Sequence, residues 1–283
     1  MMKRLMFIFL FAAVSFCNAL SQEKLDDAVF RAVYTFSYKT RPDQTEYAKS
    51  DLMYLDMGKK ASKFYSRNQE VRDSIRHAAM MKNSSPEVAV EAARGYQRGT
   101  PHIYYILQDI KKVRVTTEYV LYGYMYEEPL VMPKWTILDD TMTFVGYSCQ
   151  RATTRYLGRE WEVYFTTDIP INKGPWKLWG LPGLIVRAED KDRYFRYELN
   201  NFEKQSSSTP IIYVHHKFDI GKGAYAGEAY KHITKKTYQQ YEKTFNEDFA
   251  AFSRIEFGRN IHMSQDGSPV THKIKKDYIP LEK

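Results

Sequence analysis

A twelve-residue stretch, GPWKLWGLPGLI at residues 174–185, constrains the chain more than any other. It contains three glycines, two prolines and two tryptophans. Glycine is needed where φ is positive or where another backbone comes close, and proline fixes φ and removes a hydrogen-bond donor. This density predicts a chain path held in one shape on the way into a strand. Its members are the first candidate binding residues: Trp176, Trp179, Gly180, Leu181, Pro182 and Gly183.

The start of the chain has the layout of a cleaved secretory signal. Two basic residues precede an apolar run over residues 5–16, and small residues stand at the −3 and −1 positions before Gln22. The run is too short to span a membrane. Phe16 stands before Cys17, whereas a lipoprotein signal needs a small residue there. We therefore predict removal of residues 1–21, export to the periplasm or the outer membrane, and no membrane span in the mature chain.

Cysteine usage and composition indicate one domain that is stabilised by its core. Cys17 leaves with the predicted signal, so Cys149 has no partner for an intrachain disulfide. A chain of about 260 residues is long enough to build one large domain, which we place at residues 22–283. The 23 tyrosines and 16 phenylalanines favour strands. The net charge of +8 is spread along the chain without a basic stripe, which argues against nucleic acid as a partner.

Alternation of apolar and polar residues predicts strands along most of the chain, beginning with residues 28–38. Connections between the strand-like segments of residues 102–202 are short, so the sheet is expected to be antiparallel and mostly sequential. Helical spacing predicts an insertion near residues 69–97 and a helix near 235–253. Residues 205–210 are interpreted as a polar loop. The predicted fold is mostly β: a strongly curved antiparallel sheet, or a half-open barrel, with helices packed on it.

Several blocks of the sequence occur in the order found in the GLPGLI family of exported Bacteroidetes proteins. Residues 180–185 match the signature hexapeptide of that family without a change, and GREW at 158–161 resembles an earlier block. YIPLE at residues 278–282 resembles the family's closing segment. The resemblance implies an exported, β-rich protein and carries over no catalytic residue. Two residues of the GREW block complete the candidate binding residues: Arg159 and Trp161.

Motifs of the common enzyme classes are absent from the sequence. It contains no Gly-x-Ser-x-Gly, no His-Glu-x-x-His, no phosphate-binding glycine loop and no Cys-x-x-Cys. Cys149 has no histidine within 45 residues, which favours a small buried side chain over a nucleophile. Neighbouring strand residues face opposite ways, so His215 and His216 do not readily bind one ion. Turn positions explain the acidic pairs Glu127 and Glu128, Asp139 and Asp140, and Asp190 and Asp192. We predict no catalytic residue, no metal and no cofactor.

The loop at residues 174–185 has two interpretations. In the first it is a structural corner whose tryptophans fill the core. In the second it is an aromatic groove for an extended peptide, a lipid chain or a neighbouring protein, because tryptophan is frequent among residues that dominate interfaces. We predict that one of Trp176 and Trp179 is buried and that the other is at least partly exposed.

Three functions remain open at this stage. The first is a non-catalytic periplasmic binding or accessory protein that holds an apolar or extended ligand, a lipid or a peptide, or docks on an outer-membrane transport complex or another envelope protein. The second is a hydrolase or a redox or metal protein that uses Cys149 or the turn carboxylates. The third is a structural component of the envelope.

Overall fold

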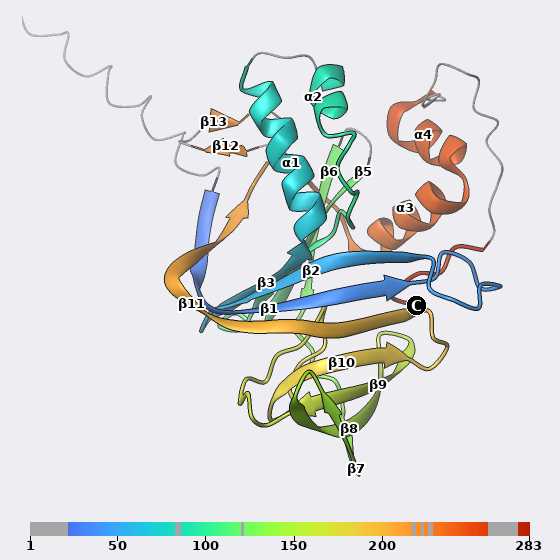
Figure 1. Ribbon diagram of the computed structural model, residues 1–283. Coiled ribbons are helices and arrows are strands. Elements are labelled where there is room, and N and C mark those ends of the chain that lie inside the picture. Colours follow the sequence, from blue (N-terminus) through green and yellow to red (C-terminus); the bar gives the residue numbers. More distant parts are fainter. Residues whose placement is uncertain are drawn as a thin grey trace, which may run out of the picture.

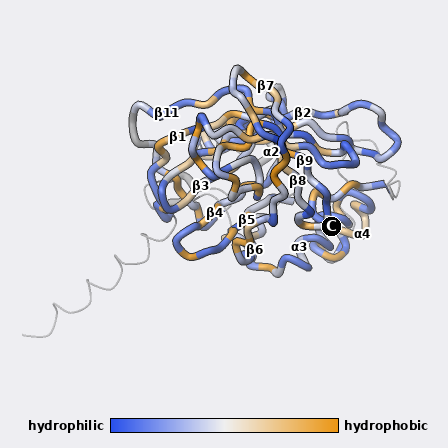
Figure 2. The backbone as a smooth tube through the Cα atoms, turned by 90° about the horizontal axis from the view of Figure 1, so that it is seen from below, coloured by the Kyte–Doolittle hydropathy of each residue, from blue (hydrophilic) through white to orange (hydrophobic). Residues whose placement is uncertain are grey.

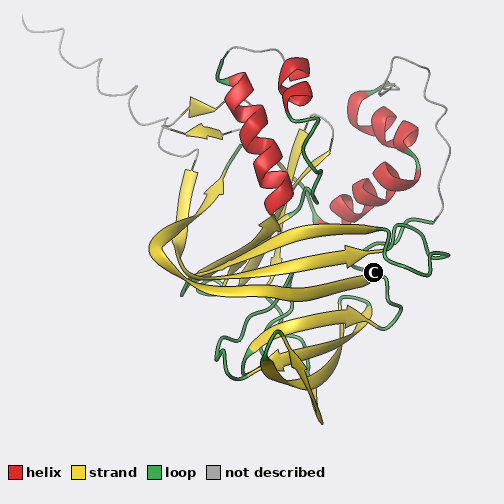
Figure 3. Ribbon diagram, in the orientation of Figure 1, coloured by secondary structure: helices red, strands yellow, loops and turns green. Residues whose placement is uncertain are grey.

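The computed structural model describes residues 22–82, 86–119, 122–216, 219–221, 224–225, 229–259 and 277–283. The predicted signal at residues 1–21 lies outside the described residues. The described chain is mostly β, with one open, curved sheet and helices packed on it (Figure 3), which confirms the predicted fold class. No described helix combines the length and the apolar composition that crossing a membrane requires.

Twelve of the described strands form the large sheet, and two short strands pair separately. The strands of the large sheet are β1 (Gln22–Tyr38), β2 (Lys49–Met57), β3 (Ala61–Ser66), β4 (Ile103–Leu107), β5 (Lys112–Tyr119), β6 (Tyr122–Pro129), β7 (Thr136–Phe144), β8 (Tyr147–Tyr156), β9 (Arg159–Thr166), β10 (Leu184–Asp190), β11 (Phe195–Val214) and β14 (Lys231–His232). The separate pair is β12 (Asp219–Gly221) and β13 (Ala224–Tyr225). The helices are α1 (Arg67–Met80), α2 (Pro86–Ala92), α3 (Lys235–Glu247) and α4 (Phe249–Phe257).

Two meanders make up the large sheet. Strands β1 to β6 lie side by side in chain order, and so do β7 to β11. Within the described chain the meanders are joined by one strand pairing, the antiparallel seam between β1 and β11. Figure 1 shows this seam across the middle of the molecule, with β7 to β10 below it and the four helices above it. Apart from the parallel pairing of the short β14 with β6, all pairings are antiparallel, as predicted.

The interpretation of residues 205–210 as a loop is wrong, because these residues belong to β11. Thr209 pairs with Ala28 of β1 and Lys204 pairs with Phe30, so residues 205–208 lie opposite a single residue of β1 as a wide bulge. The polar composition of the segment suggested a loop, but β1 continues past it and pairs with β11 on both sides of the bulge. A partner from the other end of the chain thus overrides the local preference.

The helical insertion predicted near residues 69–97 contains α1 and α2, and α1 begins after Ser66, which accepts a hydrogen bond from the amide of Gln69 at 3.0 Å. The single helix predicted near 235–253 is in fact two helices. Asp248 leaves the helical conformation, with φ −141° and ψ 81°, and its carboxylate caps α4 by accepting from the amide of Ala251. An aspartate at an N-cap satisfies a backbone donor that the new helix leaves free.

The main core lies between the sheet, the helices α3 and α4, and the connection from β9 to β10. Phe245 and Phe252 place their rings 4.9 and 5.7 Å from the ring of Tyr119 on β5. Figure 2 shows hydrophobic and hydrophilic stretches alternating along the strands. A second, smaller cluster of buried side chains lies where the curled ends of β1 and β11 approach β3 and β4: Ala28, Ala61, Tyr105, Leu107, Ile211 and Tyr213.

Candidate functional site

The connection between β9 and β10, residues 167–183, is called the signature loop below, and it folds back on itself. Three backbone hydrogen bonds of 3.0 to 3.1 Å fix its path, with the donor and acceptor pairs Gly180 and Asn172, Leu184 and Ile169, and Ile185 and Lys173. Trp176 adopts a positive φ of 56°, which side chains other than glycine rarely allow. The predicted fixed path of this stretch is therefore present.

Two glycines of the signature loop are required by their surroundings. Gly180 has a φ of +98°, and a Cβ atom there would lie 2.7 Å from the side chain of Met132. At Gly183 a Cβ atom would lie 1.9 Å from the backbone oxygen of Thr166. Any larger residue at Gly183 would therefore push the loop away from β9.

The two tryptophans of the signature loop differ in burial, which confirms the prediction that one is buried and the other at least partly exposed. Trp176 is 1% exposed, and its ring lies 5.5 Å from that of Trp161, which is also 1% exposed. Trp179 is half-buried. The other candidate residues divide in the same way: Arg159, Leu181 and Gly183 are buried, Gly180 is half-buried, and Pro182 is exposed.

Trp179 lies in an apolar surface that we call the signature patch: Val131, Met132, Trp135, Trp179 and Gly180. Its indole Nε1 donates to the carbonyl of Val131 at 3.3 Å, and Trp135 Nε1 donates to the carbonyl of Trp179 at 2.8 Å. Val131 is 59% exposed and Met132 is 54% exposed. The signature loop and the connection from β6 to β7 thus present apolar side chains to solvent on a hydrogen-bonded frame.

Arg159, at the start of β9, holds the segment of residues 277–283, which we call the strap. Its guanidinium donates to the carbonyl oxygens of Pro280 and of Leu281, the latter at 3.0 Å. The same guanidinium pairs with Asp190 at 2.8 Å, and both side chains are 1% exposed. A buried arginine is thereby satisfied by a carboxylate on one side and by backbone of the strap on the other.

Lys177 of the signature loop lies at the centre of a buried ion cluster. Its Nζ atom contacts the carboxylates of Glu128 on β6 and Glu282 of the strap, and its side chain has 0% exposed surface. Lys235 at the start of α3 contacts the same two carboxylates at 2.7 and 2.6 Å. Burial alone would raise the pKa of Glu282, but Lys177 and Lys235 together hold this pKa below its ordinary value. The cluster ties sheet, loop, helix and strap together.

Sequence reasoning missed this cluster. The available signal was a lysine between two tryptophans, Trp176 and Trp179, in a stretch interpreted as partly buried. A lysine is almost never fully buried unless it is paired. Its partners stand 49 and 105 residues away, so no local pattern identifies them.

A second group of titratable residues, largely but not fully buried, lies beside the first. Burial raises the pKa of Glu242 on α3 to about 7, against hydrogen bonds from Tyr278 of the strap and from Tyr238. Burial, aided by Lys177, lowers the pKa of His102 to about 4. The Nε2 atom of His102 lies 3.7 Å from the carboxylate of Glu242. Between these two pH values both side chains are uncharged, which suits their burial.

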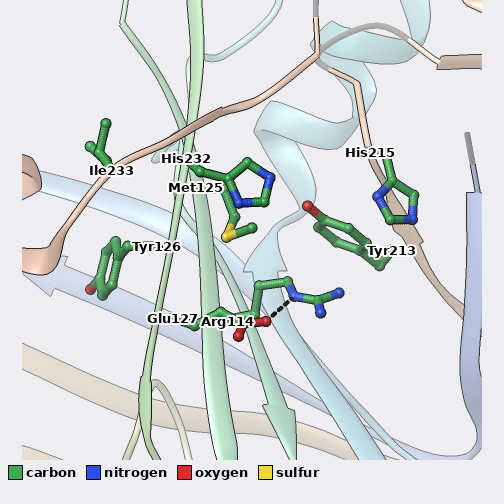
Figure 4. A pocket seen from close by; sticks show the side chains of 8 residues that line it. All are labelled: Arg114, Met125, Tyr126, Glu127, Tyr213, His215, His232 and Ile233. Atoms are coloured by element: carbon green, nitrogen blue, oxygen red, sulfur yellow. Dashed lines mark hydrogen bonds and ion pairs between the residues drawn. The ribbon is translucent and has the colours of Figure 1, made fainter.

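A cavity of about 250 Å³ lies where β14 meets β6 (Figure 4). Arg114 donates to Glu127 at 2.8 Å and pairs with Glu23, and its guanidinium lies 4.2 Å from the centre of the Tyr213 ring. His215 and His232 also line the cavity, whereas His216 is not among its lining residues. Because its arginine is already paired with carboxylates, this cavity has little preference for a charged ligand.

A second cavity of about 560 Å³ crosses the strands β7 to β10. Thr136, Thr153, Glu162 and Glu189 stand in one row across these four strands. Both acidic and basic side chains belong to its lining, and Lys191 pairs with Glu160 at 2.7 Å. The cavity is a polar trough and offers little apolar surface to a lipid chain.

Cys149 is a buried core residue, as its sequence context predicted. It is 1% exposed, and burial raises the pKa of its thiol, which disfavours the reactive thiolate. Among the described residues no group of three or more His, Cys, Asp or Glu side chains is placed to hold a metal ion.

The interpretation of the acidic pairs as solvated turn residues holds only in part. Asp139 and Asp140 are exposed as expected, but they lie within β7 and not in a turn. Glu127 and Glu128 lie within β6, where they pair with basic side chains. Asp190 is buried, and its carboxylate accepts hydrogen bonds from Arg159 and from the backbone of the following turn. These bonds compensate the carboxylate for its loss of water.

Residues 158–187 match the family model described as "Protein of unknown function (Porph_ging)". An uncharacterised family thus shares the segment that carries Arg159, Lys177 and the signature loop. No match to the chain was found among curated proteins.

Among solved structures, two of PNGF-II, in the space groups P21 and C2, resemble this chain. Their TM-scores are 0.45 and 0.46, at 12% and 11% sequence identity. Each match covers 75% of this chain and 32% of the other, so this chain spans about a third of the length of the structures that it matches. A TM-score below 0.5 is too low to transfer a function.

Proposed function

We propose that this chain is an exported protein of the GLPGLI family that acts by binding and not by catalysis, in the periplasm or at the outer membrane. In this proposal the signature patch docks on another envelope protein, a component of an outer-membrane transport complex. The observation that carries the proposal is the exposure of Met132 and Val131 beside the half-buried ring of Trp179.

The physical basis is the cost of leaving this surface in water. Exposed apolar side chains gain free energy when a partner covers them, and tryptophan is frequent among the residues that dominate such interfaces. The core is already filled by Trp176 and Trp161, so Trp179 is not needed for that purpose. The hydrogen bonds that fix Trp135 and Trp179 lower the entropy cost of ordering the surface on binding.

The other candidate functions have less support. A lipid or other apolar ligand in an internal cavity fits poorly, because charged side chains line the larger cavity, among them Lys134, Arg155 and Glu160. A hydrolase or redox protein that uses Cys149 fits poorly with the burial and the raised pKa of that thiol. A structural envelope component remains the alternative that the following experiment separates.

The test is affinity capture from envelope extract with the immobilised mature protein. Met132→Glu places a charge in the signature patch and should abolish capture of the partner. Ile110→Glu is the matched control, because Ile110 and Met132 are both 54% exposed and Ile110 lies outside the patch. Thermal unfolding of both variants should match that of the parent protein.

Capture that persists in Met132→Glu and in Trp179→Ala would reject the signature patch as a docking surface. Self-assembly of the pure protein without any captured partner would favour the structural component instead.

A further inference from the structure

The strap is bound to the rest of the domain as a ligand is bound to a protein. It pairs with no strand, and the side chains of other segments make most of its contacts: Arg159 with the carbonyls of Pro280 and Leu281, Lys177 and Lys235 with Glu282, and Glu242 with Tyr278. Ile279 is its buried apolar residue, at 8% exposure. Lys283 adds a backbone hydrogen bond to the carbonyl of Leu157 and an ion pair with Asp192 at 3.3 Å.

The residue that binds the strap backbone is held in place without the strap. Asp190 fixes the guanidinium of Arg159 and itself accepts hydrogen bonds from the amides of Tyr194 and Phe195, both at 2.7 Å. The guanidinium also lies 4.6 Å from the centre of the Phe195 ring. Removal of the strap therefore leaves Arg159 oriented toward the position of the two carbonyls.

The residues that bind Glu282 are held in the same way. Lys177 keeps Glu128 as a partner and donates to the hydroxyl of Tyr126 at 3.3 Å. Lys235 also keeps Glu128, at 2.7 Å. Without the strap, two ammonium groups share one carboxylate, which leaves a buried site that attracts a second carboxylate.

The turn between β8 and β9 leaves room for the strap. Gly158 has a φ of +82°, and a Cβ atom there would lie 2.5 Å from the Cβ of Lys283 and 2.9 Å from its backbone oxygen. The site thus has an arginine that binds the peptide backbone, two lysines that bind a carboxylate, and a glycine that leaves space for the last residue of the strap.

We propose that the strap occupies a peptide-binding site, and that a separate extended peptide with the pattern aliphatic, proline, aliphatic, glutamate binds there in its place. Arg159 would hold the two carbonyls that follow the aliphatic residue, and Lys177 with Lys235 would select the glutamate. This site uses residues other than those of the signature patch, so the proposal stands whether or not the patch docks a partner.

The experiment starts from the folded full chain, so that removal of the strap does not prevent folding. A protease recognition sequence is inserted within residues 265–270, and the folded protein is cleaved there. The strap should remain bound through gel filtration and should exchange with a fluorescent DYIPLEK peptide, the sequence of residues 277–283. Exchange is followed by fluorescence anisotropy.

Two peptide variants test which contacts carry recognition. The change Glu282→Gln should weaken competition about tenfold or more, because it leaves the buried ammonium group of Lys177 and the partly exposed one of Lys235 without their second carboxylate. The control is Lys283→Ala, which loses an ion pair with Asp192. In this pair the side chain of Lys283 is 46% exposed and that of Asp192 is 51% exposed. The control change should alter competition by less than about threefold.

A protein variant tests the steric opening. Gly158→Ala should reduce peptide binding, whereas Gly146→Ala should not, because Gly146 has a nearly equal φ of +80° and no atom within 4 Å of its Cβ position. A strap that never exchanges, a cleaved chain that unfolds or loses the strap without rebinding the peptide, or equal binding of the Glu282→Gln peptide would each overturn the proposal.

Discussion

Lys177 and Glu282 form an ion pair across 105 residues of sequence, although the lysine side chain has 0% exposed surface. The pair joins the signature loop to the strap. An unpaired charge in the interior is strongly destabilising, so the fold is stable only when Lys177 and Glu282 lie in contact.

Lys177→Met should destabilise the protein strongly. It removes one of two ammonium groups from a cluster with two carboxylates, and breaking a buried pair in this way costs about 3 to 5 kcal/mol. Urea unfolding measures the change. Lys191→Met is the control, because the ion pair of Lys191 with Glu160 is exposed on both sides, at 74% and 52%, and its loss should leave unfolding unchanged. Equal midpoints for the two variants would contradict the description of the cluster.

Trp176→Ala should lower the free energy of unfolding by about 3 to 5 kcal/mol, as expected for an aromatic side chain removed from a packed core. Trp179→Ala should cost much less stability and should impair partner capture, because its ring is half-buried in the signature patch. If both variants unfold early and still capture the same partners, the signature loop has only a structural role.

Gly183→Ala should cost about 3 kcal/mol or prevent folding, at the upper end of overpacking effects, because the new methyl group meets the backbone of Thr166. Gly146→Ala should cost about 1 kcal/mol, since it strains a positive φ in open space. Chemical denaturation of both variants gives the comparison, and a smaller loss at Gly183 than at Gly146 would exclude the close approach to β9.

Glu242→Gln should change the pH dependence of stability. The folded pKa of Glu242 is raised from 4.5 to about 7, so its protonated form stabilises the fold below pH 4.5, and this contribution is lost as the pH rises to 7. The variant lacks this loss, so its stability relative to the parent should rise by about 3 kcal/mol between pH 4 and pH 8. Urea unfolding across this range tests it.

His102→Phe should show the opposite slope. The folded pKa of His102 is lowered from 6.5 to about 4, so its contribution is present above pH 6.5 and is lost as the pH falls to 4. The stability of this variant relative to the parent should therefore rise as the pH falls through this window. Flat differences for both variants would show that neither side chain is buried.

Cys149→Ala should cost about 1 kcal/mol and leave partner capture unchanged, as expected for the loss of a small buried group. A thiol reagent should modify the native protein far more slowly than the urea-unfolded chain, because the thiol is 1% exposed and its pKa is raised. Rapid native modification together with loss of function would reopen the catalytic alternative.

The strands and their antiparallel order were predictable, because alternation of burial is a local property and short connections leave few topologies. The residues that the sequence did not reveal are those whose environment is set by distant segments. Residues 205–208 bulge within a strand because β1 pairs on both sides of them. The aromatic spacing runs through Asp248, so the break between α3 and α4 was hidden by a continuous apolar face.

The candidate site shows the same limit. One buried and one partly exposed ring were predicted for Trp176 and Trp179, because the two lie three residues apart on a path too rich in glycine to be regular. The burial of Lys177 depends on Glu128 and Glu282, and Met132 lies against Gly180, 48 residues further along the chain. Neither set of contacts can be predicted from the residues next to it in the sequence.

The seam between β1 and β11 has a kinetic consequence. Each meander can form from neighbours in sequence, whereas the seam closes a loop of more than 150 residues between Tyr38 and Phe195. Non-local pairings of this kind raise the contact order and slow folding, because the chain loses loop entropy before the contacts repay it. The halves of the sheet should therefore acquire structure early, and their joining should limit the rate at which the native state appears.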